Sequence, residues 1–497
     1  MDFLVKFRKQ ITILILLSAF YFILRLPNLT LQPIFADEAI YIRWAQVMRS
    51  EPTLRFLPQS DGKTPLFMWS MIPLFKVFSD PLFAGRFLSV MSGLATLLGV
   101  FALGWKVFGI RVGVWAALLY TITPYTVFFD RMALVDSMLS AFGVWALFFA
   151  ILLAQKVRLD LAMILGFILG GGWLTKTPGV LNLILLPTSI LAFKRLKADK
   201  YHLVKLIIFW LVAIFIALVM YNALRLGSNF HLLSSRNADY VFSPLELVGR
   251  PLDPFIPHFR DIADWFPKLI TWPTIGLLVI GSWFIVKEKN KLGWVVLLWA
   301  LIPLLLNMAF LKTFTARYLL ASIPLLLVLG GFGITKLLAH LNKNFPYVLL
   351  LLILASTLYF NYYLLTDPQK APLPKVERKG YLEEWTAGYG LSEIGKYLAG
   401  ESSKQKIVVG TEGFFGTLPD GLYIYLDKAN VSMVGSTATI SAQIRNAAKD
   451  HPTFFVGNKK NLGEGLSYAK LIKAFPKANP ENGFLPDATV LYQVLPR

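Results

Sequence analysis

The chain has 497 residues, is 56% hydrophobic and has a mean hydropathy of +0.58, and apolar runs of about 20 residues recur along it. This composition excludes an ordinary soluble protein and predicts one that crosses a membrane several times. The formal charge of +20 does not indicate nucleic-acid binding, because the cations lie mostly in short loops between apolar runs. The absence of cysteine excludes disulfides and thiolate chemistry.

The apolar runs predict eleven membrane-spanning helices, of which the fifth and sixth are short and closely joined. They are expected over residues 10–27, 82–103, 110–128, 132–154, 160–175, 178–193, 204–224, 269–286, 292–310, 316–338 and 346–365. The first run follows three cations, as in a signal peptide. No small-residue cleavage site follows it, so we interpret it as a retained span.

The loops between these helices alternate in charge. One set carries most of the cations, at Lys6/Arg8/Lys9, Lys106/Arg111, Lys156/Arg158, Lys194/Arg195/Lys197/Lys200/Lys205, Lys287/Lys289/Lys291 and Lys336/Lys343. By the positive-inside rule this set is cytoplasmic. The N-terminus is then inside, and the loops 28–81 and 225–268, with everything after residue 366, face outward. Short helices that close over the site are expected within 225–268.

The first outer loop contains two adjacent acids, Asp37 and Glu38. Asp37 is expected to cap a short helix, whose positive end favours an ionised carboxylate there. Apolar residues recur at helical spacing in this segment, which predicts an amphipathic helix along the membrane interface: Ile40, Trp44, Val47 and Met48. A surface carboxylate can act as a general base toward an acceptor hydroxyl, although a solvated helix cap explains the spacing equally well.

Glu38 could orient the acceptor or help to hold a divalent cation, but two carboxylates alone do not make a metal site. His231 and His258 have no second ligand at the spacing of a zinc site. A divalent metal cofactor therefore stays a possibility, with Asp37 and Glu38 as its only candidate ligands.

Lys63 precedes Thr64-Pro65, which resembles a helix start with Thr64 as N-cap and Pro65 at the first helical position. An ammonium group beside backbone N–H groups suits a phosphate. A solvent-exposed lysine is the plain alternative for this position.

Further charged residues are expected at the outer face. Asp136 falls about one and a half turns into the fourth span, where an acid needs a partner, and Arg131 and Arg86 are candidates. Lys176, in WLTKTPG, resembles Lys63 chemically, although a snorkelling lysine fits as well. Arg317 opens the tenth span and could bind an anionic head group, or could anchor the span together with Tyr318.

The composition changes after Leu365. Residues 366–379 form a Pro- and charge-rich linker, and 380–497 form a small outer α/β domain. Strands are expected at Lys406–Gly410, Thr453–Gly457 and Ala488–Leu495, and helices at 440–449 and 464–475. The domain has no GxGxxG or phosphate-loop motif, so nucleotide binding is unsupported.

One acid pair and several isolated cations are thus expected at a single membrane level. This layout fits a substrate with a phosphate at the headgroup plane and a reacting carbon just outside it, as in a polyprenyl-phosphate sugar. The cations stabilise the departing phosphate while a carboxylate deprotonates the incoming hydroxyl.

The order of six motifs resembles the GT-C glycosyltransferases, above all the branch with protein O-mannosyltransferases and the lipid A aminoarabinose transferase. The motifs are ADEAIYIRWAQVM, DGKTPLFMW, AGRFLSV, FDRMALVDSMLSAFG, GGWLTKTPGVL and TARYLLASIPLLL, and the resemblance covers about residues 1–365. It implies an inverting transferase of hexosyl or pentosyl groups. Lys-Thr-Pro replaces the more usual Lys-Pro-Pro at Lys63, and Lys-Thr-Pro-Gly replaces Lys-Gly-Pro at Lys176, so both cations are kept.

The resemblance also implies roles for individual residues. Asp37 becomes the catalytic base, with Glu38 in acceptor or metal contacts. The donor-phosphate contacts are Lys63, Lys176 and Arg317. The network that shapes the site contains Arg86, Asp130, Arg131, Asp136 and Tyr318.

Two other classes of protein compete with this prediction. A transporter or flippase of lipid-linked sugars would also display cations at the headgroup plane, but should carry charges near mid-membrane and pseudo-repeats, and no repeat is visible. A receptor would need far fewer than eleven spans. A multi-pass protein of a bacterial cytoplasmic membrane is expected, with a polyprenyl-linked sugar donor, a hydroxyl acceptor in protein, lipid or glycan, and no nucleic acid as partners.

Overall fold

The computed structural model describes residues 7–193, 200–250, 252–340, 345–437, 439–462, 468–480 and 485–496. The chain divides into two compact units. Unit 1 comprises Met1–Pro27, Arg55–Phe67 and Phe87–Leu365. Unit 2 comprises Asn28–Leu54, Met68–Arg86 and Thr366–Arg497, so part of the first predicted outer loop is grouped with the C-terminal residues.

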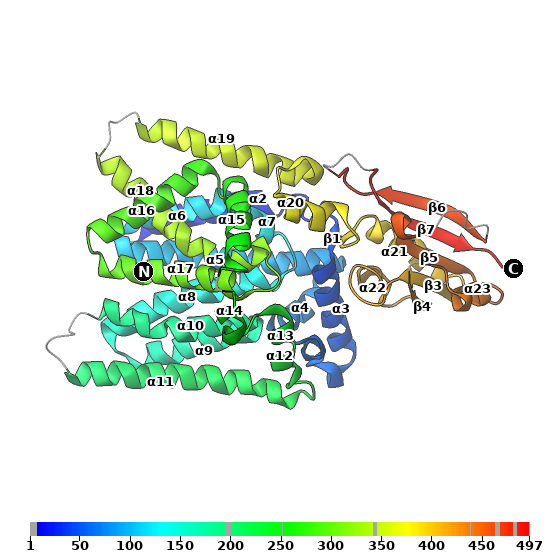
Figure 1. Ribbon diagram of the computed structural model, residues 1–497, viewed down its shortest axis with the longest axis horizontal. Coiled ribbons are helices and arrows are strands. Elements are labelled where there is room, and N and C mark those ends of the chain that lie inside the picture. Colours follow the sequence, from blue (N-terminus) through cyan, green and yellow to red (C-terminus); the bar gives the residue numbers. More distant parts are fainter. Residues whose placement is uncertain are drawn as a thin grey trace. The chain divides into compact units, whose positions relative to one another are not determined.

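Unit 1 is a bundle of apolar helices, most of them long, that run side by side (Figure 1). These helices are α2 (Arg8–Arg25), α5 (Pro81–Phe108, with its first residues in unit 2), α6 (Ile110–Ile122), α7 (Pro124–Asp130), α8 (Val135–Lys156), α9 (Leu159–Thr175), α10 (Val180–Leu185), α11 (Lys200–Asn222), α16 (Trp272–Lys287), α17 (Lys291–Phe310), α18 (Ile323–His340) and α19 (Phe345–Thr366). Short 3-10 segments extend several of them: η2 (Leu57–Asp61), η4 (Thr177–Gly179), η5 (Leu186–Ala192), η6 (Ala223–Leu226) and η7 (Ala316–Leu319).

Six of the described helices are long and apolar enough to cross a membrane, and the number rises to eight if each of two bent pairs is one span. Shorter apolar helices include Leu159–Thr175 and Thr177–Ala192, where the fifth and sixth spans are expected. The chain is therefore a multi-pass α-helical membrane protein, and the count of eleven spans stays a prediction.

Two pairs of consecutive helices that include predicted spans are sharply bent. The third predicted span is broken between Ile122 and Pro124, and its two parts meet at 61°. Proline explains the break, because it cannot donate the backbone hydrogen bond that a continuous helix requires. The eighth span, α16, follows α15 (Phe255–Leu269) at an angle of 112°. Figure 1 shows α15 lying across the long helices.

Small residues allow the helices of unit 1 to approach closely. A Cβ atom built on Gly166 of α9 would lie 2.9 Å from the carbonyl oxygen of Ala213 in α11. One built on Gly170 would lie 3.2 Å from Cα of Ala217. This spacing of small residues four apart on both helices is typical of helix pairs in membranes.

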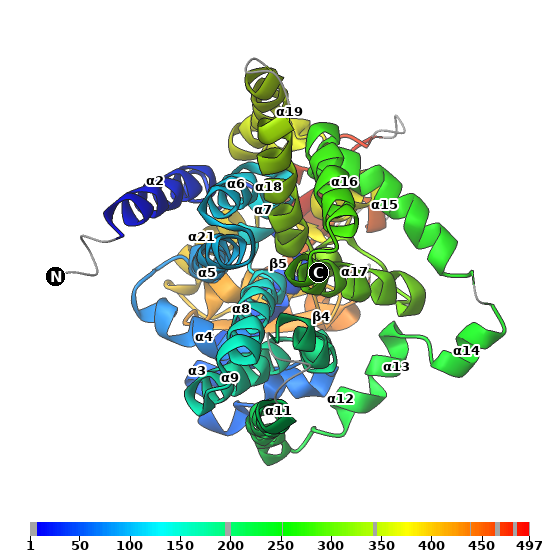
Figure 2. The ribbon, with the colours of Figure 1, turned by 90° about the vertical axis from the view of Figure 1, so that its left-hand side faces the viewer.

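Short helices connect α11 to α15 along one side of the bundle (Figure 2). They are α12 (Leu232–Ser235), α13 (Asn237–Tyr240) and α14 (Pro244–Val248). They confirm the short helices predicted within residues 225–268.

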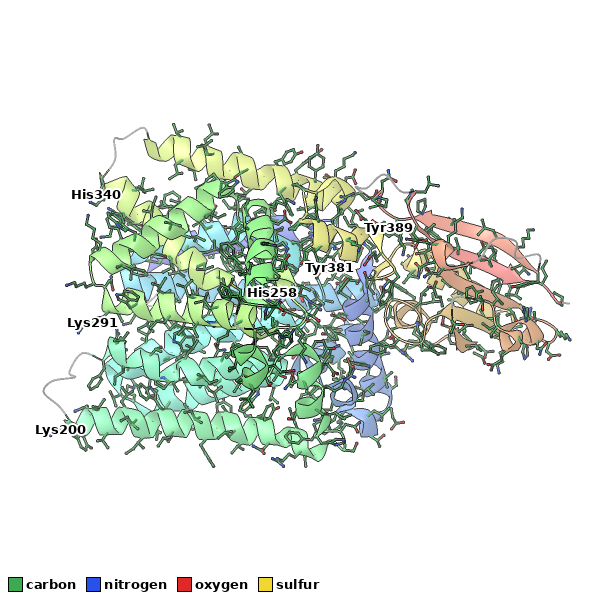
Figure 3. The ribbon with its side chains drawn as sticks, in the orientation of Figure 1. Lys200, His258, Lys291, His340, Tyr381 and Tyr389 are labelled. Carbon is green, nitrogen blue, oxygen red and sulfur yellow. The ribbon has the colours of Figure 1, made fainter. Side chains whose placement is uncertain are left out.

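Two of the predicted cytoplasmic cations, Lys200 and Lys291, lie at the same end of the long helices (Figure 3). Other members of that set lie outside the described residues: Lys6, Lys194, Arg195, Lys197 and Lys343.

Unit 2 contains a five-stranded sheet of order β4-β3-β5-β7-β6 among its described strands (Figure 1). The strands are β3 (Ile407–Glu412), β4 (Val431–Ser436), β5 (Thr453–Asn458), β6 (Ala469–Pro476) and β7 (Ala488–Val494). Strands β4, β3 and β5 are parallel, whereas β7 runs antiparallel to β5 and β6.

The helices of this unit are α4 (Leu66–Met71, with its first residues in unit 1), α20 (Lys375–Arg378), α21 (Leu391–Ser402), α22 (Asp420–Leu426) and α23 (Ala442–Ala447). Its short segments are η1 (Pro52–Leu54), η3 (Ile72–Lys76), η8 (Pro368–Lys370), η9 (Lys379–Glu383) and η10 (Lys459–Asn461).

The predicted small α/β unit and its three strands are confirmed, but the helix expected at 464–475 is wrong. Residues 469–476 form β6, an edge strand paired with β7, while 463–467 lie outside the described residues. The sequence AKLIKAF is rich in helix formers, and pairing with a neighbouring strand overrides that local preference.

The helix of the first outer loop, α3 (Ala36–Ser50), packs within unit 2. Its preceding residues form β1 (Ile34–Phe35), which pairs with β2 (Ala387–Gly388). Gln46 of α3 donates a hydrogen bond of 2.9 Å to the carbonyl oxygen of Ile424 in α22. Arg43 and Arg49 both pair with Asp427, at 2.8 Å.

Two details predicted for this helix are wrong. Because Phe35 is extended in β1, the helix begins at Ala36 and Phe35 is its N-cap, while Asp37 lies in the first turn. The residues predicted to face lipid are mostly buried in protein: Ile40, Trp44 and Met48 are buried, and Val47 is half-buried. The stripe is therefore not available as a membrane-facing surface.

Candidate functional site

The side chains of Asp136 and Tyr318, from separate elements of unit 1, meet around Lys176, which directly follows α9. Its ammonium Nζ lies 2.6 Å from Oδ1 of Asp136, in the first turn of α8. The same Nζ lies 4.1 Å from the centre of the Tyr318 ring in η7, which is within cation–π range. The guanidinium carbon of Arg317 lies 5.2 Å from that ring. Two cations therefore lie close to a single aromatic ring.

This arrangement corrects two expectations about Asp136. Its partner is Lys176, whereas we predicted Arg131 or Arg86. It also lies in the first turn of α8, because that helix begins at Val135 instead of residue 132. The ion pair is mostly buried, with 5% of the Asp136 side chain and 22% of the Lys176 side chain exposed, so solvent reaches only the lysine end.

The segment that carries Arg317 and Tyr318 is held by contacts with three helices. Asn307 of α17 donates to the carbonyl oxygen of Tyr318 at 3.1 Å, and Tyr125 of α7 donates to that of Ala316. In addition, Phe314 contacts two rings of α15. Its ring centre lies 4.1 Å from that of His258 and 4.9 Å from that of Trp265.

Lys63 belongs to a second group of charges in unit 1. Its Nζ lies 2.8 Å from Oδ2 of Asp61, whose other oxygen lies 2.6 Å from Nη2 of Arg236. Burial raises the pKa of Tyr240, and the Lys63 charge opposes that rise.

The helix start predicted beside Lys63 is displaced. Helix α4 begins at Leu66, so Pro65 precedes it, and the buried Oγ1 of Thr64 has no hydrogen-bond partner among the described residues. Thr64 is therefore not the N-cap.

The acid pair of α3 splits into two environments within unit 2. Asp37 is half-buried, whereas Glu38 is fully buried. The carboxylate of Glu38 binds Arg86 through two hydrogen bonds of 2.8 and 2.7 Å, and it also accepts from the backbone N–H of Phe35 at 2.9 Å. The other Arg86 N–H groups donate to the carbonyl oxygens of Leu29, Gln32 and Pro33.

These contacts bear on the metal that the acid pair could hold. Both oxygens of Glu38 are already engaged by strong donors, so they do not fit a divalent cation. No group of three or more His, Asp or Glu side chains placed to bind a metal occurs within the described ranges of the chain. We therefore derive no step through a metal.

The comparisons with known proteins agree with this architecture. A family described as Dolichyl-phosphate-mannose-protein mannosyltransferase matches residues 62–222, about a third of the chain. No curated protein matches the sequence. The crystal structure of ArnT from Cupriavidus metallidurans bound to undecaprenyl phosphate is similar over 98% of both chains, with a TM-score of 0.59 and 14% identity.

A second similar structure is the archaeal oligosaccharyltransferase AglB from Archaeoglobus fulgidus, in complex with an inhibitory peptide and a dolichol-phosphate. It matches over 91% of this chain and 70% of its own, with a TM-score of 0.52 and 12% identity. The chain has the GT-C glycosyltransferase fold. The resemblance predicted from the motif order is confirmed at this level.

Within this GT-C fold, Asp130 and Arg131 occupy buried positions that hold helices together. Asp130 accepts hydrogen bonds from Tyr120 and Ser137 at 3.0 Å and lies 3.4 Å from Arg25. Arg131 donates to the carbonyl oxygens of Arg25 and Pro27, at the end of α2. These contacts favour a structural role for both residues.

Residues missed by the sequence analysis complete the charged surroundings of this GT-C fold. Asp61 contacts Lys63 directly, and Arg236 contacts Asp61 on its other oxygen. The acid two residues before Lys63, in DGK, was a visible signal. Nothing local marked Arg236, because its partner is 175 residues away in the sequence.

Proposed function

We propose that the protein is an inverting glycosyltransferase. It transfers one sugar from a polyprenyl-phosphate carrier to an acceptor hydroxyl of a protein, lipid or glycan. The reaction takes place at the outer face of a cell membrane, in which the N-terminus is cytoplasmic and the C-terminal domain extracytoplasmic. The match to the dolichyl-phosphate-mannose-protein mannosyltransferase family and the lipid phosphates bound by ArnT and AglB support a lipid-linked donor of this class.

One observation carries this proposal above the others. In a fold of this class, Lys176 and Arg317 both lie within cation–π range of the Tyr318 ring, and Lys176 is paired with Asp136. Two cations held by different helices of a membrane protein provide a site for an anionic headgroup. A guanidinium and an ammonium group can bind phosphate oxygens together, the first in a bidentate manner.

The proposed reaction is a single displacement. The acceptor oxygen attacks the anomeric carbon as the bond from that carbon to the phosphate oxygen breaks, which inverts the configuration. Asp37 takes the acceptor proton as general base. Lys63, Lys176 and Arg317 stabilise the charge that develops on the departing polyprenyl phosphate. Glu38 and Arg86 fix the start of α3, and so the position of Asp37 next to Glu38.

The test uses purified full-length protein in nanodiscs, incubated with a panel of polyprenyl-phosphate sugars and candidate acceptors. Release of free polyprenyl phosphate is measured with and without divalent cation. Asp37→Asn should reduce transfer by at least about a hundredfold while the thermal midpoint stays unchanged, since general-base catalysis contributes about 10²–10⁴-fold.

Asp160→Asn is the matched control, because Asp160 lies at an exposed ion pair with Arg158 and has no role in the proposal. Substantial transfer by Asp37→Asn would show that Asp37 is not the base. Sugar flipping between leaflets by wild-type protein without transfer would favour a transporter.

A further inference from the structure

Lys63, assigned above to the donor phosphate, is already paired with a carboxylate. Asp61 lies between two cations, with Oδ2 at 2.8 Å from Lys63 Nζ and Oδ1 at 2.6 Å from Arg236 Nη2. The side chain of Asp61 is 16% exposed, that of Lys63 25% and that of Arg236 44%. A phosphate that binds Lys63 must therefore approach a fixed negative charge.

The position of Asp61 is set by the fold of its turn. It ends η2, and Gly62 then adopts a left-handed conformation with φ of +67°. A Cβ atom on Gly62 would lie 2.4 Å from Cβ of Arg236, so the turn packs directly against that residue. Gln59 of the same turn donates to the carbonyl oxygen of Leu224 at 2.7 Å. The turn is thus fastened to the segment that supplies Arg236.

The charge of the ligand changes during the proposed reaction. The donor is a phosphodiester with one negative charge, whereas the released polyprenyl phosphate is a monoester with a second ionisation near pH 6. The product therefore carries nearly one extra negative charge at neutral pH. A neighbouring carboxylate repels the product more strongly than the donor.

We propose that Asp61 is a positioning residue that competes with phosphate for Lys63 and so promotes product release, with Arg236 as the cation that keeps Asp61 paired when phosphate occupies Lys63. This inference rests on the proposed function, because it takes Lys63 as a phosphate contact. When the product leaves, Asp61 recovers its contact with Lys63. No bond is made or broken in this exchange.

Electrostatics set the expected size of the effect. One unit charge several ångströms away, in a partly exposed setting, changes the affinity for an anion by about tenfold. Asp61→Asn should therefore bind polyprenyl phosphate about five- to tenfold more tightly than the wild type. Arg236→Gln should bind it about threefold more weakly, because Asp61 then depends on Lys63 alone.

The experiment measures the dissociation constant of polyprenyl phosphate for the full-length protein in nanodiscs at pH 7.5. The variants are Asp61→Asn, Arg236→Gln, their combination, Asp61→Glu and Lys63→Gln. Asp61→Glu keeps the charge and should restore near-wild-type affinity. The pair Arg158 and Asp160, at 2.6 Å, provides matched exposed controls, Arg158→Gln and Asp160→Asn, which should leave the constant unchanged.

The combined variant decides between competition and a merely structural role. If Asp61 competes for Lys63, the loss caused by Arg236→Gln disappears once Asp61 is neutral, so the combination matches Asp61→Asn within about twofold. Weaker or unchanged binding by Asp61→Asn overturns the inference, as does an Arg236→Gln loss that persists in the combination. In turnover, Asp61→Asn should also show stronger inhibition by added polyprenyl phosphate.

Failure of the proposed function gives a different result. If Lys63→Gln leaves polyprenyl phosphate binding unchanged, Lys63 is not a phosphate contact, and the inference falls with that assignment. If Lys63→Gln weakens binding but Asp61→Asn does not strengthen it, the proposed function stands and only the role of Asp61 is refuted.

Discussion

The ion pair Glu38–Arg86 in unit 2 and the ion pair Lys176–Asp136 in unit 1 differ in how exposed their charged groups are and in how many contacts those groups already make. Glu38 and Arg86 are buried to 1% exposure or less, and five hydrogen bonds use all the N–H groups of the guanidinium. In the second pair solvent reaches Lys176, whose ammonium also faces an aromatic ring. A saturated buried pair can only hold structure, whereas a partly open one can take a further ligand.

The largest effect that would test this contrast is on stability. Arg86→Ala should lower the free energy of unfolding by about 3–5 kcal/mol, because it leaves the Glu38 carboxylate buried without its partner. Chemical denaturation in detergent measures this loss. The double variant Glu38→Leu/Arg86→Leu should be less damaging than the single one. If Arg86→Ala lowered the free energy of unfolding by less than about 1 kcal/mol, the Glu38–Arg86 pair would not have the structural role assigned to it.

The next effect concerns donor use. Lys176→Ala should raise the apparent KM for a polyprenyl-phosphate sugar about tenfold, as expected for one lost charge-assisted contact to phosphate. Lys176→Arg keeps the charge and should lose about threefold or less. Steady-state kinetics at saturating acceptor separate KM from kcat. If the KM of Lys176→Ala were unchanged, the Lys176–Asp136 pair would be a structural contact, like the Glu38–Arg86 pair.

A smaller effect is expected from the ring beside Lys176. Tyr318→Phe keeps the aromatic face and should leave the KM for the donor nearly unchanged. Tyr318→Leu removes a cation–π contact of about 0.5–1 kcal/mol and should raise that KM by about two- to fivefold. Equal losses from both substitutions would assign the role to the hydroxyl group instead of the ring.

The smallest effect is expected for an exposed ion pair, which serves as the control for the three predictions above. Arg158 and Asp160 form a pair at 2.6 Å, as short as Lys176–Asp136, but both side chains are more than half exposed. Solvent screening makes such pairs nearly neutral for stability. Arg158→Ala should change neither the thermal midpoint nor the transfer rate, which would show that burial, and not distance, separates these pairs.

The sequence alone determined the class of the protein and many of its elements. Apolar runs and loop cations predicted a multi-pass helical bundle, because lipid requires long, internally hydrogen-bonded apolar segments. The motif order predicted the GT-C fold, and short buried apolar runs such as Thr453–Gly457 predicted the small α/β unit. Lys176 and Arg317 were chosen from their own local patterns.

Only the tertiary structure decided which of these residues meet. Asp136 pairs with Lys176, 40 residues away, and Asp61 with Arg236, 175 residues away, and no local pattern encodes either contact. Strand pairing likewise made 469–476 a strand against its helical composition and moved the start of α3 to Ala36. Local preferences amount to a fraction of a kcal/mol per residue, so long-range packing and buried charge pairs, each worth more, determine the final arrangement.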